Sequence, residues 1–144
     1  MRVEIELVTK IEQEGAKIST MELTDSVKQA KQLLECNAKE IPAVKDEKTY
    51  LIEPDKIYYA ESIDNKSFVY TKDDCFEVKY KLYELEQILD YRFFRCSKSM
   101  ICNVKKIRSV KAEYNAKMVA TLLNEEEIVI NRSYVKELKK RLGM

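Results

Sequence analysis

The segment FFRCSKSMICNVKKIRSVK, residues 93–111, combines an apolar framework with a dense positive charge. Apolar side chains recur along it, which is typical of chain that packs into a core. It also contains six basic residues, no acidic residue and no glycine. The segment therefore predicts an ordered structure that presents positive charge at fixed positions. The apolar residues are Phe93, Phe94, Met100, Ile101, Val104, Ile107 and Val110, and the basic residues are Arg95, Lys98, Lys105, Lys106, Arg108 and Lys111.

The charge of the whole chain is divided unevenly around this segment. Residues 92–144 carry 13 basic and 5 acidic side chains, a net charge of +8, whereas residues 1–91 carry 13 basic and 20 acidic side chains, a net charge of −7. A solvated surface normally mixes the two signs, so the basic half predicts a polyanionic partner. The alternative is a basic surface region without a ligand, because charge blocks are common.

Length and composition place the chain among globular proteins. Its 144 residues, 45% of them hydrophobic, suit one domain or one domain with a small appendage. No apolar run approaches the roughly 20 residues that span a bilayer, and the first ten residues, MRVEIELVTK, lack the apolar region of a signal peptide. We therefore expect a cytoplasmic protein.

Several enzyme classes are excluded by the residues that the chain lacks. There is no histidine, which removes Ser-His and Cys-His catalysis and the commonest metal ligand. The only glycines, Gly15 and Gly143, cannot form a phosphate-binding glycine loop. We expect no catalytic site, metal, cofactor or small-molecule substrate. The four cysteines form no C-x-x-C pair and are expected to be free thiols; they are Cys36, Cys75, Cys96 and Cys102.

Residues 1–40 are predicted to form a βα appendage. RVEIELV, residues 2–8, alternates apolar and acidic side chains as a half-buried strand does, and AKISTMEL, residues 16–23, is a candidate second strand. Thr24 or Asp25 then caps a predicted helix that runs to about Asn37. The apolar stripe of that helix comprises Val27, Ala30, Leu33 and Leu34, and Pro42 is expected to mark a boundary after it.

Residues 41–144 are predicted to be mainly β, with short helices. Tyr, Phe, Val and Ile crowd short runs, as strands prefer. Polar turns separate these runs, among them IDNK (residues 63–66), Asn115–Ala116 and residues 124–126. Residues 81–91 show a helical period, with Leu82, Leu85, Ile88 and Leu89 on one face. Residues 133–144 form a second predicted helix, with Val135, Leu138 and Leu142 facing inward and Gly143 at its end. The predicted strands are residues 49–54, 56–62, 67–72, 75–81, 93–96, 107–114, 117–123 and 127–131.

With these elements placed, residues 41–144 resemble the LytTR family of bacterial DNA-binding domains. The resemblance is carried by IYYAESIDNKSFVYT (residues 57–71), FFRCSKSMICNVKKIRSV (93–110) and EIVINRSYVKELKK (127–140), in the order and spacing of the family. It implies an elongated β-β-β sandwich of about ten short strands that reads major-groove bases with loops between strands. Residues 1–40 are too short for the receiver domain of many members, so the chain resembles the stand-alone type.

The family positions, carried over residue by residue, imply a set of DNA contacts. Base contacts fall on Lys66 or Ser67 in the first block, on Lys98 in the second and on Arg132 in the third. Arginine is suited to bidentate contact with guanine. Phosphate contacts fall on Arg95, Ser97, Lys105, Lys106, Ser133 and Tyr134. The implied partners are duplex DNA with tandem half-sites, a second copy as a homodimer on DNA, and a membrane-bound inhibitory protein.

Other interpretations remain open at this point. The chain could be a β-rich protein-interaction module whose basic half docks an acidic partner, or an RNA-binding domain that stacks bases on aromatic side chains. Asn103 is expected to bond to backbone instead of a base. Some relatives have a redox-sensing cysteine where this chain has Cys96, but we expect an unreactive thiol. Tyr58, Tyr59 and Tyr70 are expected in the core or on the sheet surface.

Overall fold

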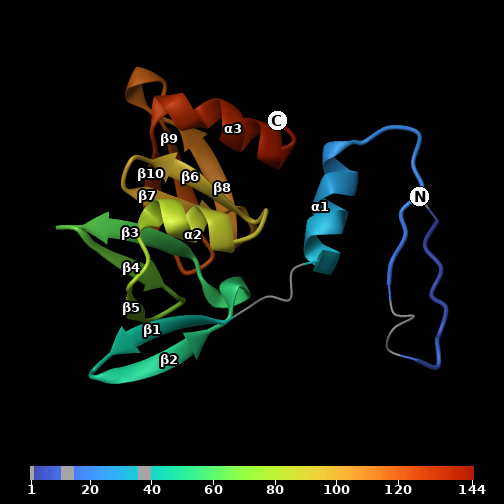
Figure 1. Ribbon diagram of the computed structural model, residues 1–144. Helices are drawn as coiled ribbons and strands as arrows, with labels where there is room; N and C mark the ends of the chain where they lie inside the picture. Colours follow the sequence, from blue (N-terminus) through green and yellow to red (C-terminus); the bar gives the residue numbers. More distant parts are fainter. Residues whose placement is uncertain (1, 11–14, 36–39) are drawn as a thin grey trace. The chain divides into compact units, whose positions relative to one another are not determined.

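The computed structural model describes residues 2–10, 15–35 and 40–144. The chain divides into two compact units, Met1–Glu35 and Cys36–Met144 (Figure 1). In the part of the chain that the structure describes, no helix is long and apolar enough to cross a membrane.

The described residues of the N-terminal unit, 2–10 and 15–35, contain one helix, α1 (Asp25–Glu35). The predicted cap is present, because the Thr24 hydroxyl accepts a hydrogen bond from the Val27 N–H at 3.3 Å. The predicted end of this helix, near Asn37, lies outside the described residues. The predicted apolar stripe is buried at Val27 but exposed at Leu33 and Leu34.

The two strands predicted before α1 are wrong for the described residues. Neither residues 2–8 nor residues 16–23 form a strand, and Val3, Ile5 and Leu7 are exposed. Alternation of apolar and polar residues indicates only that a strand could bury one face. A strand also needs a neighbour for its backbone N–H and C=O groups, and the sequence pattern does not show whether one is present.

Ten strands form two antiparallel sheets in the C-terminal unit, which confirms the mainly-β prediction. The seven-stranded sheet has the order β2-β1-β5-β4-β3-β7-β6, and the three-stranded sheet has the order β10-β9-β8. The first contains β1 (Ile41–Lys45), β2 (Lys48–Ile52), β3 (Tyr59–Ile63), β4 (Lys66–Tyr70), β5 (Cys75–Val78), β6 (Phe93–Ser97) and β7 (Met100–Asn103); the second contains β8 (Ile107–Ala112), β9 (Met118–Leu122) and β10 (Glu127–Ile130). The remaining elements are α2 (Leu82–Ile88), α3 (Arg132–Leu142) and the short helices η2 (Pro54–Lys56), η3 (Val104–Lys106) and η4 (Tyr114–Ala116).

Tight turns set the register of the hairpins. Asp64 and Asn65, between β3 and β4, both have positive φ, 50° and 64°, as a two-residue hairpin turn of matching twist requires. Pro42, expected to mark a boundary, instead lies inside β1, paired with Leu51. The proline is tolerated there because β1 pairs with β5 only at Val44, so Pro42 lies outside that ladder.

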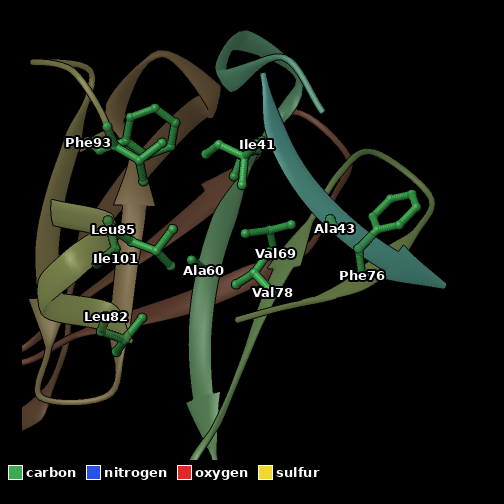
Figure 2. Close-up of a cluster of buried hydrophobic side chains, with 12 residues drawn as sticks. Ile41, Ala43, Ala60, Val69, Phe76, Val78, Leu82, Leu85, Phe93 and Ile101 are labelled. Carbon is green, nitrogen blue, oxygen red and sulfur yellow. The ribbon is translucent and has the colours of Figure 1, made fainter. Parts of the chain in front are cut away.

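The first hydrophobic core lies between α2 and the seven-stranded sheet. Figure 2 shows Leu82 and Leu85 of α2 pointing toward Ile101 and the small side chain of Ala60. Ile88 was predicted to face this core but is 49% exposed, because α2 ends there and the following Leu89 is buried instead. The buried members are Ile41, Ala43, Ile57, Ala60, Val69, Phe76, Val78, Leu82, Leu85, Leu89, Phe93 and Ile101.

The second core lies beneath α3 and the three-stranded sheet. Leu138 of α3 is fully buried, and Val135 and Leu142 are partly buried against it, as their helical spacing predicts. Gly143 ends α3 with φ of 75°, and its N–H bonds to the carbonyls of the last turn. The buried members of this core are Tyr58, Phe94, Cys96, Cys102, Met118, Ala120, Leu122, Ile128, Ile130 and Leu138.

The β6–β7 hairpin is shared by the two cores. Phe93 belongs to the first core and its neighbour Phe94 to the second; on β7, Ile101 and Cys102 divide in the same way. Alternate residues of a strand point to opposite faces, so an apolar residue at every position buries both faces. This explains why the segment has adjacent apolar residues at Phe93–Phe94 and at Ile101–Cys102.

Asn103 closes the hairpin with backbone hydrogen bonds, as the sequence analysis expected. Its carboxamide is fully buried, donates to the Ile57 carbonyl at 2.9 Å, and accepts from the Lys105 N–H at 3.0 Å. A buried amide is stable only with such partners. Asn103 therefore anchors the chain where it leaves β7 for η3.

The described cysteines are free thiols in different environments. Cys96 and Cys102 are fully buried, whereas Cys75 is exposed; Cys36 lies outside the described residues. Burial raises the pKa of the Cys96 thiol to about 12 and raises the pKa of Cys102 well above its usual value. A thiol in this state provides almost no thiolate near neutral pH, which supports the expectation that Cys96 is unreactive.

We expect Leu85→Ala to lower the free energy of unfolding by about 2–5 kcal/mol, because it leaves a cavity in the first core. Ile88→Ala on the same helix should change it by less than about 0.5 kcal/mol, since that side chain is half exposed. Urea denaturation of both variants measures the difference. Equal losses would show that α2 does not pack through Leu85.

Alkylation should separate the thiols. With iodoacetamide at pH 8, we expect rapid labelling of the peptide that contains Cys75 and labelling of Cys96 and Cys102 only after unfolding. Cys96 in the folded protein should remain unlabelled even at pH 9.5, because the side chain is fully buried and, with a pKa of about 12, only a small fraction of the thiol is ionised at that pH. Peptide mass mapping resolves each site, and native labelling of Cys96 would contradict the burial.

Candidate nucleic-acid interface

The first predicted reading position lies at the tip of the β3–β4 hairpin. Lys66 begins β4 directly after the Asp64–Asn65 turn, its side chain is exposed, and it pairs across the hairpin with Ile63. The side chain makes no ion pair or hydrogen bond with the residues that the structure describes. Ser67, the alternative at this position, is only 6% exposed because it lies on the buried face of β4 with Val69. Of the two, only Lys66 is accessible to a base.

The second predicted reading position is the β6–β7 turn. Lys98 and Ser99 form its tip, and the Lys98 ammonium is exposed without a partner among the described side chains. The Ser97 hydroxyl accepts from the Ser99 N–H at 3.2 Å and lies 3.4 Å from the Ser99 hydroxyl. Arg95 was predicted to contact phosphate, but its guanidinium is bound within the chain, to the Glu86 carboxylate and the Lys98 carbonyl.

The third predicted reading position begins α3. Arg132 is the first residue of the helix and follows Asn131, its N-cap residue. Its side chain is exposed and has no ionic or hydrogen-bonding partner in the described part of the chain. Glu125, a carboxylate that could otherwise pair with Arg132, pairs with Arg108 instead. Arg132 is therefore available for an external ligand.

A hollow of about 400 Å³ lies beside Arg132. It is lined by Asn115, Lys117, Asn131, Arg132 and Ser133, which include two cations and no acid. The start of α3 also presents backbone N–H groups and the positive end of the helix dipole, which favour anions. Sequence reasoning identified the turn at Asn115 but missed that its fold brings Asn115 and Lys117 beside Arg132. Tyr134, by contrast, is partly buried against the second core.

Two backbone hydrogen bonds tie the three positions to one hairpin. The Ser62 N–H, near the tip that carries Lys66, donates to the Ser99 carbonyl at 2.8 Å. The Asn131 N–H, next to Arg132, donates to the Cys96 carbonyl at 3.0 Å. Figure 1 shows the strands of these turns running side by side in the C-terminal unit. The spacing between the three basic side chains is therefore set by the β6–β7 hairpin.

Two further cations lie just after β7. Lys105 is exposed, and its backbone N–H is fixed by Asn103. Lys106 is partly buried, and its ammonium lies 5.2 Å from the centre of the Tyr58 ring, a distance suited to a cation–π contact. η3 therefore presents one free lysine and one lysine held against the protein.

The tyrosines are engaged in packing, as expected from their strand positions. Tyr58 is buried, and Tyr59 and Tyr70 stack on each other with ring centroids 4.3 Å apart. Burial and the neighbouring Glu126 carboxylate raise the pKa of Tyr59, while burial is the main cause of the raised pKa of Tyr70. These rings are not free to stack on nucleobases.

Comparisons with known proteins agree with this architecture. The model of the LytTr DNA-binding domain family matches residues 47–143. The transcriptional regulatory protein YpdB of Escherichia coli (strain K12) is 31% identical over 106 residues, which cover 72% of this chain and 43% of YpdB. The sensory transduction protein LytT of Enterococcus faecalis is 28% identical over 105 residues, with 72% of this chain and 43% of LytT covered. The chain thus spans less than half the length of these two relatives.

A solved structure has the same fold. It is the LytTr DNA-binding domain of a putative methyl-accepting/DNA response regulator from Bacillus cereus, which superposes with a TM-score of 0.70 at 25% sequence identity. The match covers 74% of this chain and 98% of that domain. Since the family model also covers more than half of the chain, this protein belongs to the LytTR family of DNA-binding domains.

Proposed function

We propose that this protein is a sequence-specific regulator of transcription, without enzymatic activity, that reads the major groove with Lys66, Lys98 and Arg132. One observation carries the proposal: three exposed basic side chains, none with a partner in the described chain, sit on three ordered turns tied to a single hairpin. Base recognition requires side chains at fixed positions, whereas phosphate contact requires only proximity. Ser67 is left out because it is buried.

The phosphate contacts are assigned to residues that flank these turns. Lys105 is exposed after β7, and Ser133 lies in the first turn of α3 beside the basic hollow. The helix start supports an anion through its backbone N–H groups. The full set is Ser97, Lys105, Lys106, Ser133 and Tyr134; Arg95 is left out because its guanidinium is bound within the chain.

The rival functions fit these observations less well. An RNA-binding surface normally stacks bases on exposed aromatic rings that lie together on a sheet face. Tyr58, Tyr59 and Tyr70 are packed, and the strongly exposed rings of Tyr83 and Tyr114 lie on separate elements, α2 and η4. An acidic protein partner would be attracted to the basic half but would not require unpaired cations on three linked turns. A preferred duplex sequence, selected from a random pool, distinguishes a DNA reader from a protein-docking module.

We further propose that two copies bind like-oriented half-sites as a homodimer on DNA in the cytoplasm. One chain supplies three reading positions, which suits a single half-site. The N-terminal unit exposes apolar side chains at Val3, Ile5, Leu7, Leu33 and Leu34, which would be available to a second copy or to a membrane-bound inhibitory protein.

Arg132→Ala should weaken binding to the selected site by about 1–3 kcal/mol and relax the preference at one base pair. The physical reason is the loss of the guanidinium, which can donate two hydrogen bonds to one base. Arg132 follows strand β10 and begins helix α3, and both elements are packed against the second core. Binding to random duplexes should change much less. Titration of selected and random duplexes by fluorescence anisotropy measures the ratio of specific to random duplex affinity.

Lys105→Ala is the matched control for that measurement. It should weaken specific and random duplexes about equally and lower the slope of log K against log salt by about one. If Arg132→Ala also leaves the specific-to-random ratio unchanged and only lowers the melting temperature, Arg132 is a structural residue and does not read bases.

The tandem arrangement predicts a footprint of two half-sites. Their centres should lie about one helical turn, roughly 10 base pairs, apart, because two copies on one face of the duplex must repeat with the helix. Hydroxyl-radical footprinting on the selected duplex measures this spacing. Protection of one isolated half-site at saturation would contradict the arrangement.

A further inference from the structure

The turn that carries Lys98 is fixed by three separate hydrogen bonds to its backbone. The Ser99 carbonyl accepts from the Ser62 N–H, the Ser99 N–H donates to the Ser97 hydroxyl, and the Lys98 carbonyl accepts from Arg95. Two of these contacts are neutral. The third is made by a charged guanidinium, and charge-assisted bonds are shorter and stronger.

Arg95 links this turn to helix α2. Its Nε lies 2.8 Å from Oε1 of Glu86 in α2, and its Nη1 lies 2.6 Å from the Lys98 carbonyl oxygen. The pairing of β6 with β7 shifts between Arg95 and Ser97, so the turn begins at a bulge. A bulge redirects the strand and loses ladder hydrogen bonds, which leaves the turn dependent on side-chain contacts.

The geometry points to a positioning role: Arg95, anchored by Glu86, sets the orientation of the Lys98 turn and thereby the base preference at the position that Lys98 reads. This assignment rests on the proposed function. A guanidinium presents several N–H donors in one rigid plane, so Arg95 can bind a carboxylate and a carbonyl at once. A lysine at this position would keep the charge but lose the planar fork.

The positioning role and a simple charge effect have opposite consequences at Glu86. Glu86 is an acidic residue, and removal of an acid raises the attraction of a protein for DNA. If Glu86 only added negative charge, Glu86→Ala would strengthen binding to every duplex. If Glu86 anchors Arg95, the same change weakens recognition of the preferred duplex relative to random DNA.

The experiment compares Glu86→Ala, which removes the acceptor for Arg95, with Glu84→Gln, which removes the same charge. Glu84 belongs to the same helix and carries the same charge, but it accepts from the Lys81 N–H and does not contact Arg95. A glutamine at position 84 can still accept that hydrogen bond, so the helix start is retained. Specific and random duplex affinities are measured for both variants, together with melting temperatures.

We expect Glu86→Ala to lower the specific-to-random ratio about tenfold, which is within the range that one base contact contributes. Glu84→Gln should leave the ratio at the wild-type value. The melting temperature should change little in both, because partly exposed ion pairs contribute little to stability. A ratio for Glu86→Ala equal to that of wild type would overturn the proposal.

Arg95→Lys supplies a second, independent test. If Arg95 positions the turn, Arg95→Lys lowers the ratio of specific to random duplex affinity and leaves the slope of log K against log salt unchanged. If Arg95 instead contacts a phosphate, Arg95→Lys leaves that ratio unchanged, and Arg95→Ala lowers the slope by about one. A lowered slope with an unchanged ratio in Arg95→Ala would overturn the proposal. Wild-type protein without any preferred duplex would overturn the proposed function itself, a result that neither variant can mimic.

Discussion

The β6–β7 hairpin is buried on both faces, and the rest of the C-terminal unit depends on this constraint. Phe93 and Ile101 pack in the core beneath α2, while Phe94, Cys96 and Cys102 pack in the core beneath α3. Interiors are close-packed, so an element fixed from both sides has little freedom to shift. The same hairpin accepts the backbone bonds that locate the β3–β4 tip and the start of α3. Core packing and the spacing of the surface cations are thus properties of one element.

The basic residues of the C-terminal half divide into two groups with different roles. Several arginines are bound within the chain: Arg92 by Asp90, Arg95 by Glu86, Arg108 by Glu125, and Arg141 by Glu137 and the Tyr91 carbonyl. Arg141 also lies over the Phe94 ring, which links α3 to the central hairpin. In contrast, Lys98, Lys105 and Arg132, together with Lys66 on the β3–β4 turn, have no partner in the described chain. Arg92 and Arg95 pair with acids that lie before residue 92, so the net charge of +8 for residues 92–144 overstates the charge that is free to meet DNA.

In the proposed mechanism, the basic residues bound within the chain order the turns that carry the unpaired cations. A lysine on a loose loop would gain affinity for any phosphate, since screening and counterion release do not depend on sequence. A lysine on a turn whose backbone is held by several hydrogen bonds, as at Lys98 and Ser99, can approach one base edge in one orientation. The internal arginines and Asn103 supply that order, and in the proposed mechanism they convert a basic surface into a reading surface. The preference for a sequence then depends on residues that never meet the DNA.

Much of the local structure could be predicted from the sequence. The strand at residues 93–97, the turns at Asp64–Asn65 and Asn115–Ala116, the cap at Thr24 and the end of α3 at Gly143 follow from side-chain patterns and backbone preferences that act over a few residues. Three sequence blocks also indicated the family, because their order and spacing are specific when taken together.

The tertiary structure decided which predicted strands form and which side chains are exposed to a ligand. Alternation predicted strands near residues 2–8 and 16–23, but no neighbouring strand completes them in the described chain. Helical periodicity placed both Ile88 and Leu89 in the core, yet Ile88, the last residue of α2, is half exposed and only Leu89 is buried. The sequence could not show that Ser67 is buried, that Arg95 is bound by Glu86, or that Lys117 lies beside Arg132. Local patterns determine which shape each short segment can take; burial, ion pairing and adjacency depend on distant segments that meet only after folding, so the tertiary structure alone decides which cations face outward.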